Sequence, residues 1–354
     1  MQIVCLNKRW KHHSASGGYD RIAEALGAID VRSTDIRSAP GRVAAKVWEH
    51  SLGRNSPVWS YSLNDRLAEE RAFWLAWRHK ADIVHSAYGD EQLNMLLSRA
   101  KRLPGQLTAT FHVPAFATRD RFERTQKDLL KRLGGAVVVA SSEVAKFSEW
   151  LGAEKVLYVP HGIDVHAFTP PTQRRPVETL RLLFVGYHMR DFEVAHYVAD
   201  RCAHEKLDVI IDVVLPEAKF SFFTACSNIE RHSNIDESAL IDLYRRADAL
   251  FLPLIHATAN NSILEALACG TPVIATDVGG IKDYVDDTSG WLLPPSDKEA
   301  AFECVLELVR NRDALEAKRA GARRKSEEFA WEKVSATLLN AYERLLKTGR
   351  FAAL

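Results

Sequence analysis

The stretch DALFLPLIHATANNSILEALACGTPVIATDVGG, residues 248–280, decides the fold that we expect for this chain. Ala249 to Pro253 is typical of a short buried strand, and Asn260 to Ser262 contains residue types that begin helices. Apolar residues then recur on one helical face up to Gly270, and Thr271 to Ala275 is typical of a second buried strand. This succession of strand, polar loop, helix and strand predicts a doubly wound α/β fold.

The polar loop before this helix is the first candidate binding site. In an open parallel sheet such a loop lies at the carboxyl ends of the strands, where ligands bind, and a helix start favours an anion. Glu265 has two interpretations in the first helical turn. It completes a capping box with Ser262, or its carboxylate accepts hydrogen bonds from a sugar or ribose diol. The spacing does not separate the two.

Residues 260–280 resemble the donor-site segment of the family 4 glycosyltransferases, which are retaining, metal-independent enzymes of the GT-B fold. The resemblance implies that Glu265 binds the ribose of a nucleotide sugar and that the preceding loop receives the diphosphate and sugar. The family commonly has another Glu where this chain has Ala257. Residues 256–261 nevertheless resemble a variant of the loop that Thr and Asn side chains line. The donor-binding candidates in this stretch are Thr258, Asn260, Asn261, Ser262 and Glu265.

A length of 354 residues exceeds what one hydrophobic core usually organises, so we expect two domains. The proline-rich linker TPPTQRRP, residues 169–176, separates them. We expect an N-terminal Rossmann-like acceptor domain over 1–168 and a C-terminal Rossmann-like donor domain over 177–335. The resemblance implies that a C-terminal helix over 336–354 packs back on the first domain.

The composition limits the functional class and the compartment. A net charge of +1 gives no argument for nucleic-acid binding. The sequence contains no run of 18 apolar residues, and its start lacks signal-peptide anatomy. Five cysteines without paired spacing fit reduced thiols. We therefore expect a cytoplasmic protein, and we leave attachment to the inner face of the membrane open.

The N-terminal segment offers a second, glycine-rich loop. Gln2 to Leu6 is typical of a buried strand, and Ser16, Gly17 and Gly18 precede a helix at about Tyr19. Most glycine pairs are only turns, but glycine also lets the backbone approach a phosphate. The family has a glycine-rich loop here that faces the donor, which favours Gly17 and Gly18 as donor-binding residues.

Two histidines are candidates in the first domain. His112 directly follows the strand expected over 107–111, and a His at this place in the family touches the donor sugar. The acid that usually follows it is replaced by Val113. His85 ends the segment DIVH, which the family often carries near the acceptor side. A lone histidine is otherwise usually a satisfied polar residue.

Aromatic and basic residues alternate from Gly41 to Lys80, in a region with a helical pattern. Such aromatics stack on an acceptor sugar, lie at a membrane surface, or, as is usual at helical spacing, pack in a core. The aromatics are Trp48, Trp59, Tyr61, Phe73, Trp74 and Trp77. A further basic set could face an anionic acceptor or a membrane surface, but a solvated helix face is the favoured explanation: Arg119, Arg121, Arg124 and Lys127.

The second domain opens with the buried strand 180–186, and the loop after it carries the candidate catalytic cation. The family places an Arg directly after Gly186 and a Lys several residues later, where this chain has Tyr187 and Phe192. Arg190 is the fixed positive charge nearby, with His188 as a second donor, and a departing diphosphate needs such a charge. A surface salt bridge is the alternative for Arg190.

The resemblance also places the nucleotide base. Ile235 and Asp236 precede a helix that resembles the family element whose opening backbone groups hold the base. An Asp before a helix is otherwise an ordinary cap, so this assignment rests on the family position.

Together these features predict a retaining, metal-independent glycosyltransferase with His112 and Arg190 as catalytic residues. The donor would be a UDP- or GDP-sugar, and the acceptor a glycan, a lipid-linked molecule or a small molecule. No Asp-x-Asp occurs in a suitable loop, so we expect no metal and no cofactor. A catalytically degenerate sugar-nucleotide sensor and a GT-B epimerase remain alternatives, whereas a dehydrogenase is disfavoured because no GxGxxG follows Leu6.

Overall fold

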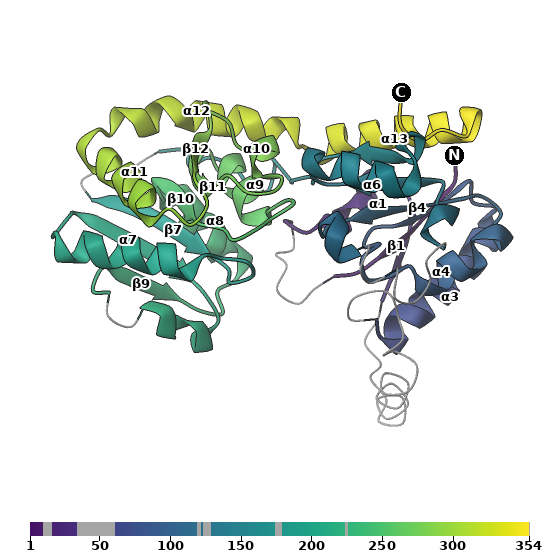
Figure 1. Ribbon diagram of the computed structural model, residues 1–354, viewed down its shortest axis with the longest axis horizontal. Helices are drawn as coiled ribbons and strands as arrows, with labels where there is room; N and C mark the ends of the chain where they lie inside the picture. The colour runs from purple at the N-terminus through teal and green to yellow at the C-terminus, as the bar shows by residue number, and fades with distance from the viewer. Residues whose placement is uncertain are drawn as a thin grey trace. The chain divides into compact units, whose positions relative to one another are not determined.

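The structure is a computed structural model that describes residues 1–9, 16–33, 61–118, 122, 129–173, 179–223 and 226–353. The chain divides into two compact units. Unit 1 comprises Met1–His13, Gly18–His161 and Trp331–Leu354, and unit 2 comprises Ser14–Gly17 and Gly162–Ala330. Figure 1 shows both units, with many of their elements labelled.

Unit 1 contains a parallel sheet of six strands in the order β2-β1-β3-β4-β5-β6. The strand β2 lies on one side of β1, and β3 to β6 lie on the other side. The carboxyl ends of β1 and β3 are therefore the switch point of this unit. The inner strands β1, β3, β4 and β5 are buried almost throughout, as is usual where helices cover both faces of a parallel sheet. Their bounds are β1 Ile3–Asn7, β2 Ile29–Arg32, β3 Ile83–Ser86, β4 Gln106–Phe111, β5 Gly135–Val138 and β6 Val156–Tyr158.

The helices of unit 1 include one long element that precedes β3 and one that ends the chain. The α-helices are α1 Ile22–Ala25, α3 Leu63–His79, α4 Asn94–Arg99, α6 Val144–Leu151 and α13 Trp331–Thr348. The 3-10 helices are η1 Tyr19–Arg21, η3 Ala100–Arg102, η4 Leu130–Arg132, η5 Ser141–Glu143 and η6 Ala153–Lys155.

Unit 2 repeats the architecture with a parallel sheet in the order β12-β11-β10-β7-β8-β9. Its switch point lies between β7 and β10, which pair through Ala249 with Leu182 and Leu250 with Leu183. The strands are β7 Leu180–Val185, β8 Val209–Val214, β9 Ile229–His232, β10 Ala249–Leu252, β11 Val273–Thr276 and β12 Gly290–Leu293. The helices are α7 Phe192–His204, η7 Glu217–Phe223, α8 Glu237–Arg246, α9 Asn261–Ala268, α10 Ile281–Tyr284, α11 Lys298–Arg310 and α12 Asp313–Glu328.

The sequence predictions for the deciding stretch are confirmed. The first strand is β10, the helix is α9, and the second strand is β11, pairing parallel to β10. Gly270 follows the helix with φ of 66°, the left-handed conformation expected just past a helix end. Two doubly wound α/β units therefore form the chain, as the sequence predicted.

The division between the units differs from the predicted linker at 169–176. The chain changes unit after His161, because Ile163 forms a bridge with Ala330 and Val165 and Phe168 belong to the core of unit 2. Residues 174–176 of the predicted linker lie outside the described residues. The whole of α13 belongs to unit 1, from Trp331 onwards.

The helical pattern predicted from Gly41 to Lys80 is realised over Leu63–His79. Phe73 and Tyr61 are buried, as expected for core aromatics, but Trp74 and Trp77 are 64% and 50% exposed. The core interpretation is therefore wrong for these two tryptophans. Trp48, Trp59 and the basic set Arg119, Arg121, Arg124 and Lys127 lie outside the described residues.

Candidate functional site

The candidate site of unit 2 lies at the switch point between β7 and β10. The loop after β7 carries Gly186 to Asp191, and the loop after β10 leads to the start of α9. Backbone hydrogen bonds join the two loops, since Ile255 N donates to Met189 O at 3.0 Å and Asp191 N donates to Pro253 O at 3.0 Å. The two sequence-predicted segments are thus side by side within this unit.

Asn260 is the residue that caps α9. Its side-chain oxygen accepts a hydrogen bond from Ser262 N at 3.0 Å. Asn260, and not Ser262, is therefore the N-cap residue of this helix. Ser262 is buried within the first turn, Thr258 is buried in the preceding loop, and Asn261 is half-buried. These side chains and the first N–H groups of an eight-residue helix lie together at one end of α9.

Glu265 is buried, and the hydroxyl of Tyr244 donates to its Oε2 at 2.8 Å. Burial next to this carboxylate raises the pKa of Tyr244 well above its ordinary value, so the phenol remains a donor at neutral pH. Tyr244 lies on α8, so this bond fixes the carboxylate from a neighbouring helix. Sequence reasoning missed Tyr244.

Arg190 is 9% exposed, and its guanidinium lies between the two loops. Its Nε donates to Val185 O at 2.9 Å, Nη1 donates to His188 O at 3.0 Å, and Nη2 donates to Ser262 Oγ at 3.5 Å. Burial lowers the pKa of Arg190 to about 10, which leaves the side chain charged at neutral pH. A buried cation therefore lies against the first turn of α9, and the surface salt-bridge alternative for Arg190 is wrong.

The backbone of the loop explains how Arg190 reaches this place. Gly186 has φ of 79° and Met189 has φ of 54°, so two left-handed residues turn the chain back toward β10. A Cβ atom on Gly186 would lie 3.1 Å from Arg190 Nη2, so glycine leaves room for the guanidinium.

Tyr187 and Phe192 stand where the family has its cations. Tyr187 is 47% exposed with Lys219 at 5.9 Å from its ring centroid. Phe192 begins α7 and stacks on Phe222, with ring centroids 4.2 Å apart. Phe192 therefore belongs to an aromatic cluster and not to an anion site.

The remaining candidates of unit 2 have simpler surroundings. Asp236 caps α8 by accepting from Ala239 N at 2.8 Å, and this bond lowers its pKa. Ile235 is half-buried against the core of unit 2, and His188 is exposed. The side chain of Asp236 is thus accounted for as an ordinary cap.

The candidate site of unit 1 centres on His112, directly after β4. The imidazole Nε2 lies 2.9 Å from Ala87 O, which assigns the proton to Nε2. Burial lowers the pKa of His112 to about 4, so the ring is neutral at neutral pH. Tyr88 stacks on the ring at 5.0 Å, and Tyr19 meets its edge at 4.6 Å.

Asp90 fixes the backbone of His112. Its Oδ2 accepts from His112 N at 2.6 Å, and burial raises its pKa to about 7. Asp90 thereby holds the turn after β4 from the loop after β3. Sequence reasoning missed it, although a carboxylate soon after a strand end is a usable signal.

His85 is not on a surface that an acceptor can reach. It is fully buried in β3, where Nδ1 lies 3.0 Å from Thr108 Oγ1 and Nε2 lies 3.1 Å from Thr110 Oγ1. Desolvation lowers its pKa to about 3. This placement does not support the predicted contact with an acceptor, because β3 is an inner strand that is buried along its whole length.

Gly17 and Gly18 are buried, and Gly18 caps η1 with φ of −86°. Neither glycine has a positive φ, so the backbone there does not demand glycine by its conformation. Their predicted contact with a donor stays a prediction.

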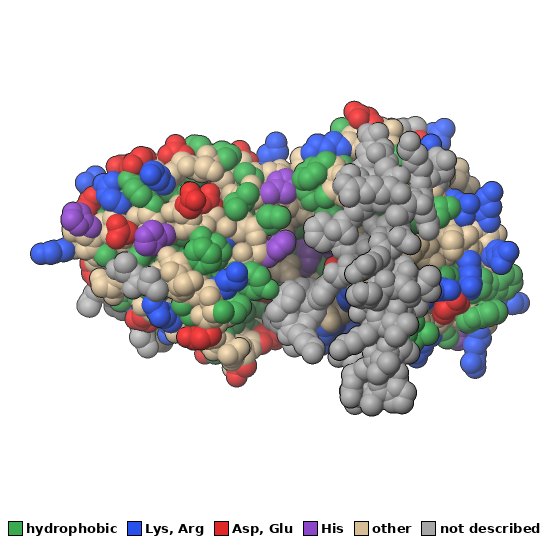
Figure 2. All heavy atoms as spheres, turned by 60° about the horizontal axis from the view of Figure 1, so that its bottom comes forward, with side chains coloured by type: hydrophobic (Ala, Val, Ile, Leu, Met, Phe, Trp, Pro, Cys, Tyr) green, Lys and Arg blue, Asp and Glu red, His purple; other side chains and the backbone are tan. Residues whose placement is uncertain are grey.

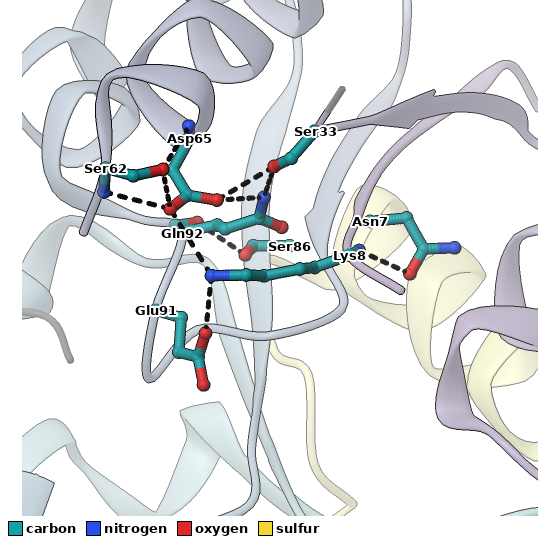
Figure 3. Close-up of polar contacts among 8 residues, drawn as sticks. All are labelled: Asn7, Lys8, Ser33, Ser62, Asp65, Ser86, Glu91 and Gln92. Carbon is teal, nitrogen blue, oxygen red and sulfur yellow. Dashed lines mark hydrogen bonds and ion pairs between the residues drawn. The ribbon is translucent and has the colours of Figure 1, made fainter. Parts of the chain in front are cut away.

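A buried charged cluster lies at the switch point of unit 1 (Figure 3). Asp65, completely buried at the start of α3, accepts from Lys8 Nζ at 3.3 Å, from Ser33 Oγ at 2.8 Å and from Gln92 Nε2 at 2.9 Å. Lys8 also pairs with Glu91 at 2.8 Å. The cluster joins the ends of β1 and β2, the loop after β3 and the start of α3. No sequence pattern connected these four segments.

One group in the described residues has the composition of a metal site, namely Asp212, Glu230 and His232 in unit 2. Arg181 bonds Asp212 at 2.8 Å and Glu230 at 2.9 Å, and Arg246 bonds Asp212 at 2.5 Å. Because arginines already neutralise these carboxylates, the group fits an ion-pair network better than a cation. Among the helices in the described part of the chain, none combines the length and apolarity that a membrane span requires.

Two family models match the chain. The model described as "Glycosyltransferase Family 4" matches residues 20–167, and the model "Glycosyl transferases group 1" matches residues 161–311. The matched segments meet close to the division between the units.

Curated relatives are similar over parts of their length. A D-inositol 3-phosphate glycosyltransferase of Xylanimonas cellulosilytica is 28% identical over 55% of this chain and 52% of its own length. A sulfoquinovosyl transferase of Arabidopsis thaliana is 23% identical over 79% of this chain and 59% of its own length. The chain thus spans about half the length of the first of these relatives.

Solved structures share the fold over nearly the whole chain. A sucrose-phosphate synthase from Thermosynechococcus elongatus superposes with a TM-score of 0.73 at 17% identity, covering 98% of this chain and 100% of the other. The protein HepE of Anabaena, solved with UDP and glucose, gives 0.70 at 13% identity, with 98% and 100% covered. By the matched models and this fold, the chain belongs to the group 1, family 4 glycosyltransferases, with two Rossmann-like units in a GT-B fold.

Proposed function

We propose that this chain transfers a sugar from a nucleoside diphosphate sugar to an acceptor hydroxyl, with retention of the anomeric configuration and without a metal ion. The observation that carries the proposal is the buried cation of Arg190 against the first turn of α9 at the switch point of unit 2. A helix start and a desolvated guanidinium together suit a diphosphate.

Glu265 supplies the second element of donor binding. Tyr244 donates to its carboxylate and orients it, and a carboxylate is a suitable acceptor for the hydroxyls of a ribose. UDP is the first nucleotide to test, because the solved structure of HepE and that of a pneumococcal O-GlcNAc transferase both contain UDP. GDP is the second.

The proposed reaction needs no protein nucleophile. The acceptor oxygen attacks the anomeric carbon on the face that the diphosphate leaves, the bond from that carbon to the phosphate oxygen breaks, and the departing phosphate takes the acceptor proton. Arg190 stabilises the charge that develops on the phosphate, a contribution that is commonly the largest in such a site. In unit 1, His112 is neutral at neutral pH, and its contact with the donor sugar stays a prediction.

The acceptor is assigned only by chemical class. The curated relatives are named for inositol phosphate and sulfoquinovosyl transfer, so hydroxyls of a small polar molecule and of a lipid-linked molecule are the first acceptors to test. A role in glycan, glycolipid or polysaccharide synthesis follows from such acceptors.

Donor hydrolysis in the presence of EDTA tests this proposal. Proton NMR during the first turnovers should show the α-anomer of the sugar released from an α-linked UDP- or GDP-sugar, before mutarotation. The Arg190→Ala variant should release sugar far more slowly. Release of the β-anomer, or release that requires added magnesium, would contradict retention or metal independence respectively.

A sugar-nucleotide sensor without turnover is the second candidate, and the placement of Phe192 in an aromatic cluster favours it. A sensor would bind the nucleotide and yet release no sugar from any donor, with or without acceptors. Binding together with turnover would exclude it.

A further inference from the structure

The outward face of α3 carries large apolar side chains that no core explains. Trp74, Trp77 and Leu67 are 64%, 50% and 52% exposed. Leu67 and Trp74 are two helical turns apart, and Trp77 lies one turn beyond Trp74, so the three form a stripe along the helix. Single exposed apolar residues are common on protein surfaces, but three in a row along one helix form a patch that needs an explanation.

The helix that carries this stripe is capped at its start and packed against the core. Ser62 and Asp65 form a capping box at its start, and Asp65 ties the helix to the cluster at the switch point of unit 1 (Figure 3). Ala72, Phe73 and Ala76 bury the opposite face in the core. The exposure of the tryptophans is therefore not a sign of a loosely packed helix.

Positive charge accompanies the apolar stripe. Arg71 and Arg78 are exposed on α3, within a turn of Trp74, and Lys80 is exposed at its end. Along α3, α4 and η3, every residue of which the structure describes, Asp65 and Glu69 are buried and Glu70 is paired with Arg66 and Arg99. The exposed charge of this side is thus positive in a chain whose net charge is only +1.

Tryptophan and arginine side chains on one outward face suit the surface of a lipid bilayer. Trp side chains favour the headgroup level of a bilayer, and cations near an anionic bilayer surface attract it. The right-hand part of Figure 2 shows hydrophobic and Lys or Arg side chains side by side. We propose that the outward face of α3, defined by Leu67, Arg71, Trp74, Trp77 and Arg78, docks unit 1 on the surface of a bilayer that contains anionic lipid.

If the chain is the glycosyltransferase proposed above, this docking also indicates a class of acceptor, and that part of the inference rests on the proposed function. The start of α3 is joined through Asp65 to Lys8 and Gln92, at the carboxyl ends of β1 and β3. Leu67 lies close to Asp65 near this edge, while Trp77 and Arg78 lie toward the end of α3 that leads into the start of β3. A bilayer along the whole helix would therefore extend from there to the edge where we expect the acceptor, and it would favour a lipid-linked acceptor.

Vesicle co-sedimentation of the full chain tests the docking without any use of catalysis. We expect the wild type to sediment with phosphatidylcholine vesicles containing phosphatidylglycerol, but weakly with phosphatidylcholine alone, and salt should weaken the binding. Arg71→Ala/Arg78→Ala should lower the partition coefficient by roughly 25-fold, because each cation near such a surface contributes about fivefold. Trp74→Ala/Trp77→Ala should also lower it.

Matched variants separate this face from general charge and hydrophobicity. Leu346→Ala removes an exposed apolar residue on α13 of the same unit, and Arg310→Ala/Arg324→Ala removes two exposed cations from unit 2. Both controls should bind vesicles like the wild type. Thermal denaturation should show that all variants are folded, as expected for exposed positions.

The proposal is overturned if wild-type chain ignores anionic vesicles, or if the α3 variants and the controls lose binding equally. A concentration-dependent dimer that Trp74→Ala/Trp77→Ala abolishes would show instead that a second copy covers the face. Donor hydrolysis in solution should be unchanged in the α3 variants, so a failure of docking and a failure of the proposed transfer give different results.

Discussion

The carboxyl edges of the two sheets are built by different means. In unit 2 the switch point is formed by two loops joined through their backbones, one buried cation and the capped start of α9. In unit 1 it is held by a buried cluster in which Asp65 receives hydrogen bonds from segments up to 57 residues away in the chain. Unit 2 therefore holds its switch point with backbone hydrogen bonds and a buried cation, Arg190, that reaches Ser262 72 residues away, whereas unit 1 holds its switch point with side-chain hydrogen bonds to one buried carboxylate.

This difference predicts where each unit is vulnerable. The loss of a key residue in unit 1 should chiefly destabilise the fold. The corresponding loss in unit 2 should leave the fold in place and affect ligand binding or turnover. The following experiments test this contrast, beginning with the largest expected effect.

Asp65→Ala should lower the free energy of unfolding by about 3–5 kcal/mol, because it removes the buried carboxylate that accepts from Lys8 and from three polar groups, on Ser33, Ser62 and Gln92. Urea denaturation measures the change. Glu24→Ala, which removes a carboxylate with 77% of its side chain exposed, is the control and should change little. Equal stability of Asp65→Ala and wild type would show that the cluster does not support unit 1.

Arg190→Ala should lower turnover by about 10²–10³-fold while the protein stays folded, since a preorganised charge on the leaving group is lost. Arg190→Lys should retain part of the activity. Arg323→Ala is the matched control, because Arg323 donates to three carbonyls, Val165 O, Phe168 O and Ala268 O. Arg323→Ala should lose stability, but its turnover per folded molecule should be unchanged. If Arg190→Ala behaves in the same way, Arg190 has only a structural role.

Glu265→Gln should weaken nucleoside diphosphate binding by roughly 10- to 100-fold, the usual value of a hydrogen bond to a charged group. A thermal-shift series over ligand concentration gives the affinity. Tyr244→Phe should have a smaller effect, because the carboxylate remains but loses its orienting bond. An unchanged affinity in Glu265→Gln would remove Glu265 from the donor site.

Asp90→Asn should remove the contribution by which stability falls as the pH rises from about 4 to 7, so the variant should gain stability relative to wild type across this range. The pKa of Asp90 is raised to about 7 by burial, so its favourable contribution is complete below its unfolded pKa and is lost as the pH rises through 7. The lowered pKa values of His85 and His112 act at the acid end, where stability falls as the pH drops below about 6.5. Denaturation midpoints of both proteins across this range measure the difference in stability. Each unit of pKa shift corresponds to about 1.4 kcal/mol, so this difference should be at most a few kcal/mol. Parallel curves would contradict the assignment to Asp90.

The fold was largely predictable because its signals are local. The apolar run of β10, the capping residues before α9 and Gly270 after it all lie within one segment of the sequence. The candidate residues around α9 follow from the same segment.

The rest of the site depends on neighbours that the sequence does not order. Tyr244 reaches Glu265 from another helix, and Lys8, Ser33, Asp65 and Gln92 meet only when the strands of unit 1 assemble. His85 shows the converse. Its motif placed it at a strand end, but both faces of β3 are buried and the imidazole lies between Thr108 and Thr110 in the interior. Exposure was equally unpredictable for Trp74 and Trp77, since helical spacing alone does not say which aromatic faces the core.

Isothermal titration of UDP and GDP in EDTA, into wild type and Arg190→Ala, tests the central claim about unit 2 most directly. We predict that one of these nucleotides binds the wild type at a single site without metal, and that Arg190→Ala binds it much more weakly. Binding of neither nucleotide, or binding that appears only with magnesium, would contradict the account of an anion site formed by Arg190 and the start of α9.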